Sequence, residues 1–394
     1  MPTKASQNSS SYVSHLECSL TGQRYSHDRM RGLSDDNAPL LVRYFLDKIS
    51  EAVSKDALIQ RNPDIWRWRE FLPLPLEMEP VSLGEIETPL IAFSKLPRVF
   101  IKDEGRLPTG SFKARGMAVA VSMAKYLNES GLVVPTAGNA GSAAAAYGAA
   151  AGMPTHVYAP IDTPTVMLQE IEFHGAQCHH VDGLIDRCGQ LARKAAVENR
   201  LHDLSTLAEP YRLEGKKTIG FELALQFNWS LPDVIYYPTG GGTGFIGMWK
   251  AFDELEAIGW IDSRRPRMVS VQTLGCNPIQ QAFEGGHKDI MTGFAPVDTI
   301  VPGVRVPKPL GGRLILSVLQ ASGGHARAVS DDAIIECREQ LARSEGINLC
   351  LEGAACHVAY LSDLESGAVD RDETVVIFNT ANGLKWPMPE LRPT

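Results

Sequence analysis

The stretch Pro108-Thr109-Gly110-Ser111-Phe112-Lys113-Ala114-Arg115-Gly116 decides the fold of this chain, because it sets one lysine among small and apolar residues. A lysine must lose its proton before it can attack an aldehyde, and its ordinary pKa of about 10.4 falls when the amine is buried. Phe112, Ala114 and Met117 are the apolar neighbours that such burial requires. We therefore predict that Lys113 is a buried, reactive amine, whereas most helix lysines are solvent-exposed.

A second string, Thr239-Gly240-Gly241-Gly242-Thr243-Gly244, has the composition of a loop that binds a phosphate. Successive glycines let backbone N–H groups approach an anion without Cβ clashes, and a helix that starts there adds its dipole. A reactive amine with a separate phosphate loop is what pyridoxal 5'-phosphate needs, because the amine forms a Schiff base with its aldehyde. We predict this cofactor, bound by Lys113, Thr239, Gly240, Gly241, Gly242 and Thr243.

The same loop permits a second interpretation, because Gly242-Thr243-Gly244-Phe245-Ile246-Gly247 fits the G-x-G-x-x-G pattern of dinucleotide sites. Such a site needs an acidic residue for the ribose near the end of the next strand. The next candidate strand, 268–272, is followed by Thr273-Leu274-Gly275 and offers no acidic residue. A dinucleotide site is therefore less favoured, and a plain structural turn is the third interpretation.

Short apolar segments alternate with helical segments over most of the chain. Helices are expected over 39–53, 112–126 and 184–199, and strands over 99–102, 132–136, 155–159, 177–181, 234–237, 268–272 and 374–379. Most of these strands are near-continuous apolar runs, which is typical of parallel strands covered on both faces. The alternation predicts an α/β protein with ligands at the carboxyl ends of its strands. The segments 136–142, 239–244 and 379–383 all lie at such ends.

Composition narrows the possible partners. The 394 residues are 44% hydrophobic with a net charge of −8 and no cluster of Lys and Arg, so no nucleic-acid partner is expected. The seven cysteines contain no C-x-x-C pair, so we expect no metal site, and reduced thiols in a cytoplasmic protein. We see no secretion signal and no run near the ~20 apolar residues of a membrane span, so no membrane partner is expected.

Further motifs show which family the chain resembles. Positions 108–113 reproduce the P-T-G-S-F-K pattern of the fold-type II pyridoxal phosphate enzymes, and 136–142 resembles their G-N loop. The segments 352–355, 380–385, 15–25 and 39–44 are similar to those of one group among them, the threonine synthases. The resemblance covers most of the chain. It implies a homodimer with a large cofactor-binding domain (46–115 and 225–394), a smaller inserted α/β domain (116–224) and an N-terminal extension (1–45), with mostly parallel sheets.

The resemblance also implies individual roles. Asn139 is expected to hydrogen-bond the phenolic oxygen of the cofactor, and Thr380 its pyridine nitrogen. The substrate carboxylate is expected to bind the loop of Thr136, Ala137, Gly138 and Ala140. Glu352 either orders the site or caps a helix. A substrate with its own phosphate needs a second anion site, for which the candidates are Lys102, Arg115, Arg212 and Lys217; Arg115 is included among the predicted substrate-binding residues.

The activity that the resemblance implies is conversion of the amino acid O-phosphohomoserine and water into threonine and phosphate. It would proceed by γ-elimination and then addition of water at the β-carbon, with Lys113 moving the protons. The chain departs from the family pattern at Ala114, at Leu20 and Thr21, and at Asn382, where Asp, a second cysteine and His are frequent. The alternative is therefore an ammonia-lyase or β-replacement enzyme acting on serine, threonine, diaminopropionate or a phosphorylated amino acid. A rival of another class binds the cofactor or an amino acid without turnover, and the presence of Lys113 disfavours it.

Overall fold

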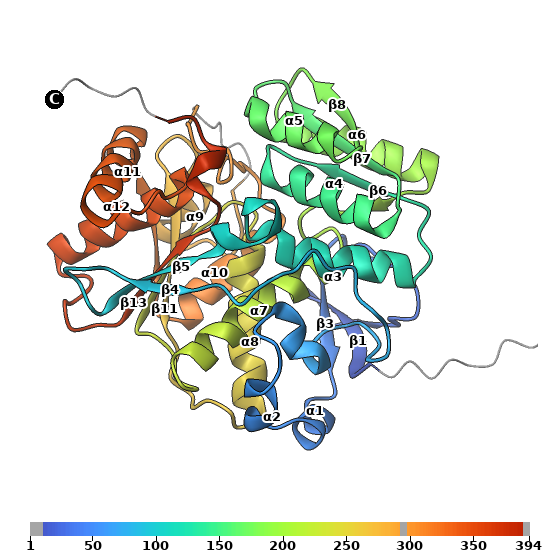
Figure 1. The fold of residues 1–394 in the computed structure, drawn as a ribbon, viewed down its shortest axis with the longest axis horizontal. Coiled ribbons are helices and arrows are strands. Elements are labelled where there is room, and N and C mark those ends of the chain that lie inside the picture. The colour runs from blue at the N-terminus through green and yellow to red at the C-terminus, as the bar shows by residue number, and fades with distance from the viewer. Residues whose placement is uncertain (1–10, 292–297, 389–394) are drawn as a thin grey trace, which may run out of the picture.

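The computed structural model describes residues 11–291 and 298–388. Two separate sheets, each with its own helices, make up most of the molecule (Figure 1). The elements β6 to β8 with α4 to α6 form one lobe, and the larger sheet lies beside it with α11 and α12 on its outer side. The predicted α/β class is therefore confirmed.

The larger sheet has six strands in the order β12-β11-β10-β13-β5-β4. They are β4 (Leu90–Ala92), β5 (Val99–Asp103), β10 (Val234–Pro238), β11 (Arg267–Thr273), β12 (His325–Val329) and β13 (Val375–Asn379). Only β4 runs antiparallel to its neighbour, and every residue of β10 and β13 is buried. The apolar runs thus form central strands covered on both faces, as their sequence predicts.

The smaller sheet is wholly parallel, in the order β8-β7-β6-β9. Its strands are β6 (Leu132–Pro135), β7 (Thr155–Pro160), β8 (Gln177–Val181) and β9 (His202–Asp203), and its helices are α4 (Asn139–Ala151), α5 (Thr165–Phe173) and α6 (Ile185–Asn199). In α4 the residues Ala143 to Ala146 are buried. Small side chains let this helix pack closely on the sheet, as Gly148 does against Thr155.

The remaining helices connect and cover the two sheets. They are α1 (Leu46–Ala52), α2 (Lys55–Ile59), α3 (Lys113–Tyr126), α7 (Tyr211–Gln226), α8 (Thr243–Ala257), α9 (Pro278–Glu284), α10 (Gly312–Ala321), α11 (Asp331–Glu345) and α12 (Leu351–Ser366), with 3-10 turns η1 (Ile65–Phe71), η2 (Glu104–Arg106), η3 (Pro108–Gly110) and η4 (Gly383–Lys385). The helix α3 contacts both α4 and α7, so the chain passes between the sheets along helices. The predicted domain boundaries near 115 and 225 fall inside α3 and α7, and that division stays a prediction.

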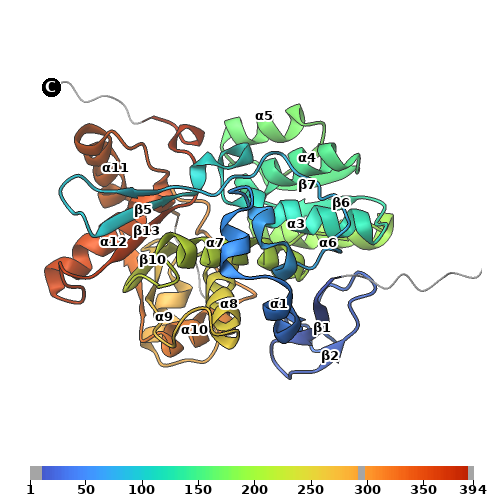
Figure 2. The same ribbon diagram turned by 60° about the horizontal axis from the view of Figure 1, so that its bottom comes forward.

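All seven strands expected from the sequence are present, but the helix predicted over 39–53 is partly wrong. Residues of β3 (Leu40–Tyr44) pair antiparallel with β1 (Val13–Cys18), which also pairs with β2 (Arg24–Tyr25), and only α1 is helical. Pairing with β1 buries Leu40, Leu41 and Val42, which overrides their local helix propensity. This small sheet lies at the edge of the molecule (Figure 2), and the Tyr44 hydroxyl donates to Glu214 Oε2 at 2.8 Å to fix it on α7.

Candidate functional site

Lys113 begins α3 directly after the turns that follow strand β5. The backbone N–H of Phe112 donates to the carbonyl of Thr380 at 2.9 Å, which ties the start of α3 to the end of β13. The Lys113 amine lies 4.0 Å from the centre of the Phe112 ring. Burial first, and the Arg212 guanidinium second, lower the pKa of Lys113 to about 7, although Glu352 opposes the shift. The amine is therefore substantially neutral near pH 7, as a nucleophile must be.

The glycine loop follows strand β10 and leads into α8, which starts at Thr243. A Cβ atom on Gly240 would lie 2.6 Å from the Gly303 carbonyl, and one on Gly241 would lie 2.6 Å from Thr206 Cγ2. Gly242 has φ +78°, which favours glycine over other residues. The first N–H groups of α8 have no partner within the helix and carry the positive end of its dipole. The loop therefore fits a phosphate, while the buried Thr239 hydroxyl donates back to the Tyr237 carbonyl at 2.9 Å.

The predicted carboxylate loop links β6 to the N-terminus of α4. The buried Thr136 hydroxyl accepts hydrogen bonds from the backbone N–H groups of Gly138 and Gly141, at 3.0 and 3.1 Å. It thereby shapes the loop and occupies the Gly141 N–H, while other N–H groups at the start of α4, such as that of Ala140, have no partner within the helix and can meet an anion. Asn139 Oδ1 is buried and has no hydrogen-bond partner in the described part of the chain. Such an atom costs stability unless a ligand satisfies it.

Thr380 follows β13 and completes the set. Its side chain is buried, and Thr380 Oγ1 lies 3.9 Å from Cys350 Sγ. Glu352 lies near Lys113 on the first turn of α12; burial raises its pKa, and its Oε2 atom has no partner among the described residues. A lysine of lowered pKa, a phosphate loop, an unpaired amide oxygen and a strand-end hydroxyl thus each follow the carboxyl end of a strand, namely β5, β10, β6 and β13. These residues fit pyridoxal phosphate, which as a bound group would supply an electron sink for the substrate's bonds.

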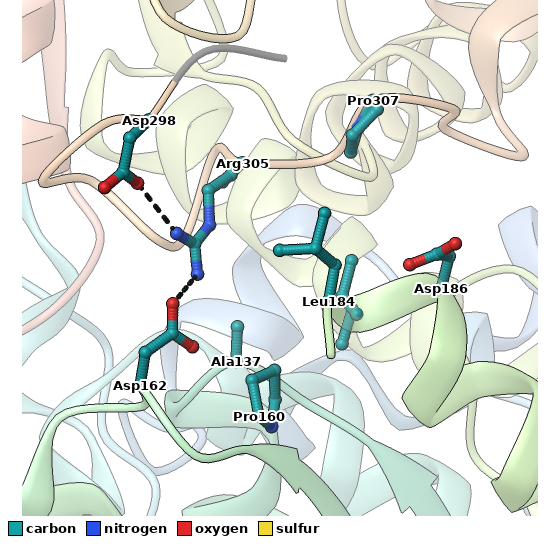
Figure 3. Close-up of a pocket in the computed structure, with 9 residues that line it drawn as sticks. Ala137, Pro160, Asp162, Leu184, Asp186, Asp298, Arg305 and Pro307 are labelled. Carbon is teal, nitrogen blue, oxygen red and sulfur yellow. Dashed lines mark hydrogen bonds and ion pairs between the residues drawn. The ribbon is translucent and has the colours of Figure 1, made fainter. Parts of the chain in front are cut away.

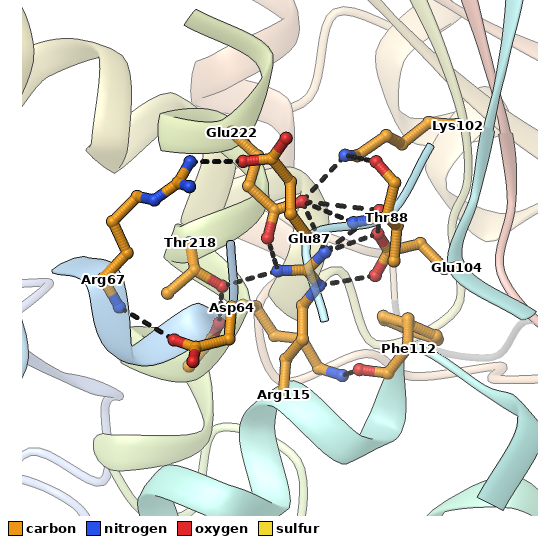
Figure 4. Close-up of polar contacts among 12 residues, drawn as sticks. Asp64, Arg67, Glu87, Thr88, Lys102, Glu104, Phe112, Arg115, Thr218 and Glu222 are labelled. Carbon is orange, nitrogen blue, oxygen red and sulfur yellow. Dashed lines mark hydrogen bonds and ion pairs between the residues drawn. The ribbon is translucent and has the colours of Figure 1, made fainter. Parts of the chain in front are cut away.

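The contacts of Arg115 within the protein disfavour its predicted role in substrate binding. Its guanidinium is fully buried and lies between Glu104 and Glu222 (Figure 4). Nε donates to Glu104 at 2.6 Å, and the other donors reach Glu222, Thr88 and Thr218. All five of its N–H groups are thus engaged, and none remains for a substrate.

Two of the other candidate cations are also engaged in the protein. The Lys102 amine bonds Glu222 at 2.7 Å, Thr88 and Gln226, and Lys217 pairs with Glu214 at 2.6 Å and with Glu254 at 2.8 Å. Arg212 differs, because none of the described carboxylates forms an ion pair with it and its Nε atom is buried without a partner. Arg212 is therefore the candidate cation without a carboxylate partner among the described residues, and it lies close enough to Lys113 to lower its pKa.

Lys216 was not among the residues predicted from the sequence. It lies one helical turn after Arg212 on α7, is fully buried and donates a hydrogen bond to the Phe112 carbonyl. The spacing of four residues puts the two cations on one face of α7. That spacing is the signal in the sequence that could have found Lys216, but it does not reveal that the face meets Lys113.

A cavity of about 290 Å³ opens beside Ala137 of the carboxylate loop (Figure 3). Loops of the smaller sheet line one side, and the segment carrying Asp298, Arg305 and Pro307 lines the other. Arg305 bridges the two sides, donating to Asp162 at 2.8 Å and to Asp298 at 3.0 Å. The carboxylate loop is therefore next to a cavity that small molecules can enter.

The cysteines, one group of possible metal ligands and the helices bear on the remaining predictions. All seven cysteines are unpaired. One group of possible metal ligands, Glu172, Cys178 and His180, has its ligand atoms within 4.8 Å of one another on the smaller lobe, and the expectation of no metal site stays a prediction. None of the helices in residues 11–291 and 298–388 has both the length and the hydrophobicity that crossing a bilayer demands.

Comparison with known proteins agrees with this geometry. A family described as "Pyridoxal-phosphate dependent enzyme" matches residues 81–381. A threonine synthase of Methanocaldococcus jannaschii is 35% identical over 382 residues, covering 95% of this chain and 94% of that protein. A threonine synthase of Methanosarcina acetivorans is 33% identical, covering 95% of this chain and 92% of that protein. Among solved structures, maize serine racemase matches with a TM-score of 0.64 at 21% identity, over 75% of this chain and 88% of that one.

Proposed function

The chain belongs to the pyridoxal-phosphate dependent enzyme family, and we infer from its relatives that it is a threonine synthase. It converts O-phosphohomoserine and water into threonine and phosphate. The observation that carries this conclusion is the 35% identity to a threonine synthase along 95% of the chain. A chemical reason supports it, because a lysine with a lowered pKa lies near a buried arginine that forms no ion pair with a carboxylate in the described part of the chain.

The chain's own residues suit the proton movements of this reaction. When bound, the cofactor supplies the electron sink that labilises hydrogens next to the substrate amine. With its pKa near 7, Lys113 can accept a proton from the substrate α-carbon and return it later. A hydroxyl such as that of Thr380 cannot protonate the pyridine nitrogen as a carboxylic acid would, which favours elimination and replacement beyond the α-carbon.

We propose that two anion-binding sites, the N-terminus of α4 and the Arg212 side chain, orient the substrate. The N–H groups at the start of α4, shaped by Thr136, would bind the carboxylate. Arg212 would bind the phosphate, because its planar fork matches phosphate oxygens and its Nε atom has no protein partner. A substrate that lacks either anion would lose this orientation and with it much of the rate.

We propose further that the enzyme is a cytoplasmic homodimer. The seven unpaired cysteines support a reducing compartment, and the dimer rests on the family resemblance. The alternative activity, ammonia release or β-replacement on serine, threonine or diaminopropionate, rests on Ala114, Asn382 and the single N-terminal cysteine, Cys18. No feature of the site geometry favours it over phosphate release.

The test measures products of the cofactor-loaded protein with O-phosphohomoserine, serine and threonine in parallel. We expect phosphate and threonine in equal amounts from the first substrate, and slower or no formation of 2-oxo acid from the others. Lys113→Ala serves as the control for cofactor-dependent turnover, and full activity in that variant would reject the assigned role of Lys113.

A further inference from the structure

Lys216 is a buried lysine beside Lys113 whose charge has no counterion in the described part of the protein. Its side chain is 0% exposed, and its amine lies 3.7 Å from the centre of the Phe112 ring, on which the Lys113 amine also lies. The amine donates one hydrogen bond, to the Phe112 carbonyl. A buried ammonium without a carboxylate is costly, so its place next to the reactive lysine calls for a ligand.

Three other buried lysines each have a carboxylate partner. Lys102 pairs with Glu222 at 2.7 Å, Lys217 with Glu214 at 2.6 Å, and Lys250 with Glu254 at 2.5 Å. Each of them therefore brings its own neutralising carboxylate. Lys217 directly follows Lys216 on α7. The two lysines therefore differ in having a carboxylate partner because they lie on different faces of the same helix.

Arg212 shares both the location and the missing counterion. A Cβ atom on Gly116 of α3 would lie 2.9 Å from the Arg212 carbonyl and 3.1 Å from Lys216 Cε. The absence of a side chain at Gly116 thus lets α7 press both cations against the start of α3, where Lys113 stands. Two unpaired cations on one face of a helix beside the reacting amine form a site for a doubly charged anion.

We propose that Lys216 is a phosphate-binding residue of the substrate site, acting with Arg212 on the phosphoryl group of the substrate and on the phosphate that is released. The inference rests on the proposed function for the identity of the substrate, but the ligand class, a phosphate dianion, follows from the two cations. The cofactor's own phosphate has a separate set of donors in the glycine loop and the start of α8.

The charge state of Lys216 gives the site a measurable property. Burial, together with Lys113, Arg212 and Arg115, holds the pKa of Lys216 well below its usual range, and Glu104 is the carboxylate that opposes this. The amine therefore gives up its proton more readily than the amine of an exposed lysine does. A phosphate dianion at this position favours the protonated amine, so binding should draw one proton from solution.

The experiment titrates inorganic phosphate into the cofactor-loaded enzyme in a calorimeter, near pH 8 and in two buffers of different ionisation enthalpy. The wild-type protein should bind phosphate with uptake of a proton. Lys216→Gln should bind phosphate about tenfold more weakly or worse, the usual worth of a charge-assisted hydrogen bond, and without the proton uptake. Lys216→Arg, which keeps a cation, should restore much of the affinity.

Lys217→Gln is the matched control, because it removes a buried lysine from the next position of the same helix. It should lower the melting temperature, since Glu214 and Glu254 lose a partner, and leave phosphate affinity unchanged. Lys216→Gln should melt no lower than wild type, because it removes an amine without a counterion. If Lys216→Gln does not fold, Lys216→Met is used in its place for the same phosphate titration.

Three outcomes overturn the inference: no phosphate binding by the wild-type holoenzyme, wild-type phosphate binding by Lys216→Gln, or a loss confined to cofactor affinity in the Lys216→Gln apoprotein. The last result would assign Lys216 to the cofactor's phosphate. Turnover of O-phosphohomoserine by the wild-type enzyme is measured separately. Phosphate binding without such turnover would reject the proposed function and leave the phosphate site standing.

Discussion

Replacing Arg115 by glutamine removes a guanidinium that makes six hydrogen bonds inside the protein, to Glu104, Glu222, Thr88 and Thr218. The side chains of Arg115, Glu104 and Glu222 are all fully buried. Glutamine reaches less far and carries no charge, so both carboxylates lose their arginine partner. Glu222 keeps Lys102 at 2.7 Å, whereas among the described residues Glu104 keeps the Thr88 hydroxyl at 2.6 Å as its remaining side-chain partner.

The expected loss follows from this geometry. Removing one partner of a buried ion pair costs about 3–5 kcal/mol, because an uncompensated charge stays behind. Part of that cost is avoided when Glu104 takes up a proton, so the lower end of the range is the better estimate. In a chain of 394 residues, each kcal/mol lowers the melting temperature by roughly 1.2 °C, which gives a drop of roughly 4 °C or more.

The assay compares thermal unfolding and steady-state kinetics of Arg115→Gln with those of Arg212→Gln. The first variant should melt early yet keep the wild-type KM for O-phosphohomoserine at a temperature where it is folded. The second should show a raised KM and a smaller loss of melting temperature, because no described carboxylate forms an ion pair with Arg212, whose Nη1 donates to the Leu204 carbonyl. An Arg115→Gln protein with wild-type melting and a raised KM would refute the reasoning and return Arg115 to the substrate site.

Three more predictions follow from the site. Because the pKa of Lys113 is lowered to about 7, the fraction of neutral amine increases as pH rises through that value. The rate at which the apoprotein binds pyridoxal phosphate, followed by absorbance, should therefore rise around pH 7. An inflection near the ordinary lysine pKa of about 10.4 would contradict the burial argument. Gly242→Ala should weaken cofactor binding in a fluorescence titration, whereas Gly259→Ala, also at positive φ but with open space around it, should lose only stability. Asn139→Ala should leave the apoprotein's melting temperature unchanged, because Oδ1 has no protein partner, and should shift the visible absorbance of the bound cofactor; an unshifted spectrum counts against contact with the phenolic oxygen.

The sequence predicted the framework well because the central strands are buried on both faces. The segments 234–238 and 375–379 are apolar throughout, so their burial could be read directly from composition. Strand β12 (His325–Val329) was missed because it is only partly buried and mixes His and Arg with small residues. The 39–53 segment was misjudged because its first half pairs with β1, a contact that no local pattern reveals.

Some residues of the candidate site could be predicted from local sequence motifs, whereas others depend on contacts with residues far along the chain. Lys113 and the glycine loop are local motifs, and each could be found from a few consecutive residues. Whether a cation is free depends on partners far along the chain: Glu222 is 107 positions from Arg115. For that reason the sequence suggested Arg115 for the substrate site and did not single out Lys216. The packing of α3 on α7 shows that Arg115 is engaged by carboxylates and that Lys216 lies beside Phe112.

The most direct test of the central claim is the yield of phosphate and threonine from O-phosphohomoserine, measured in the same reaction mixture with purified, cofactor-loaded enzyme. A threonine synthase releases the two products in equal amounts, and we predict that ratio. Phosphate without threonine, a 2-oxo acid with ammonia, or no phosphate at all would contradict the assignment and move the enzyme to another reaction of the same family.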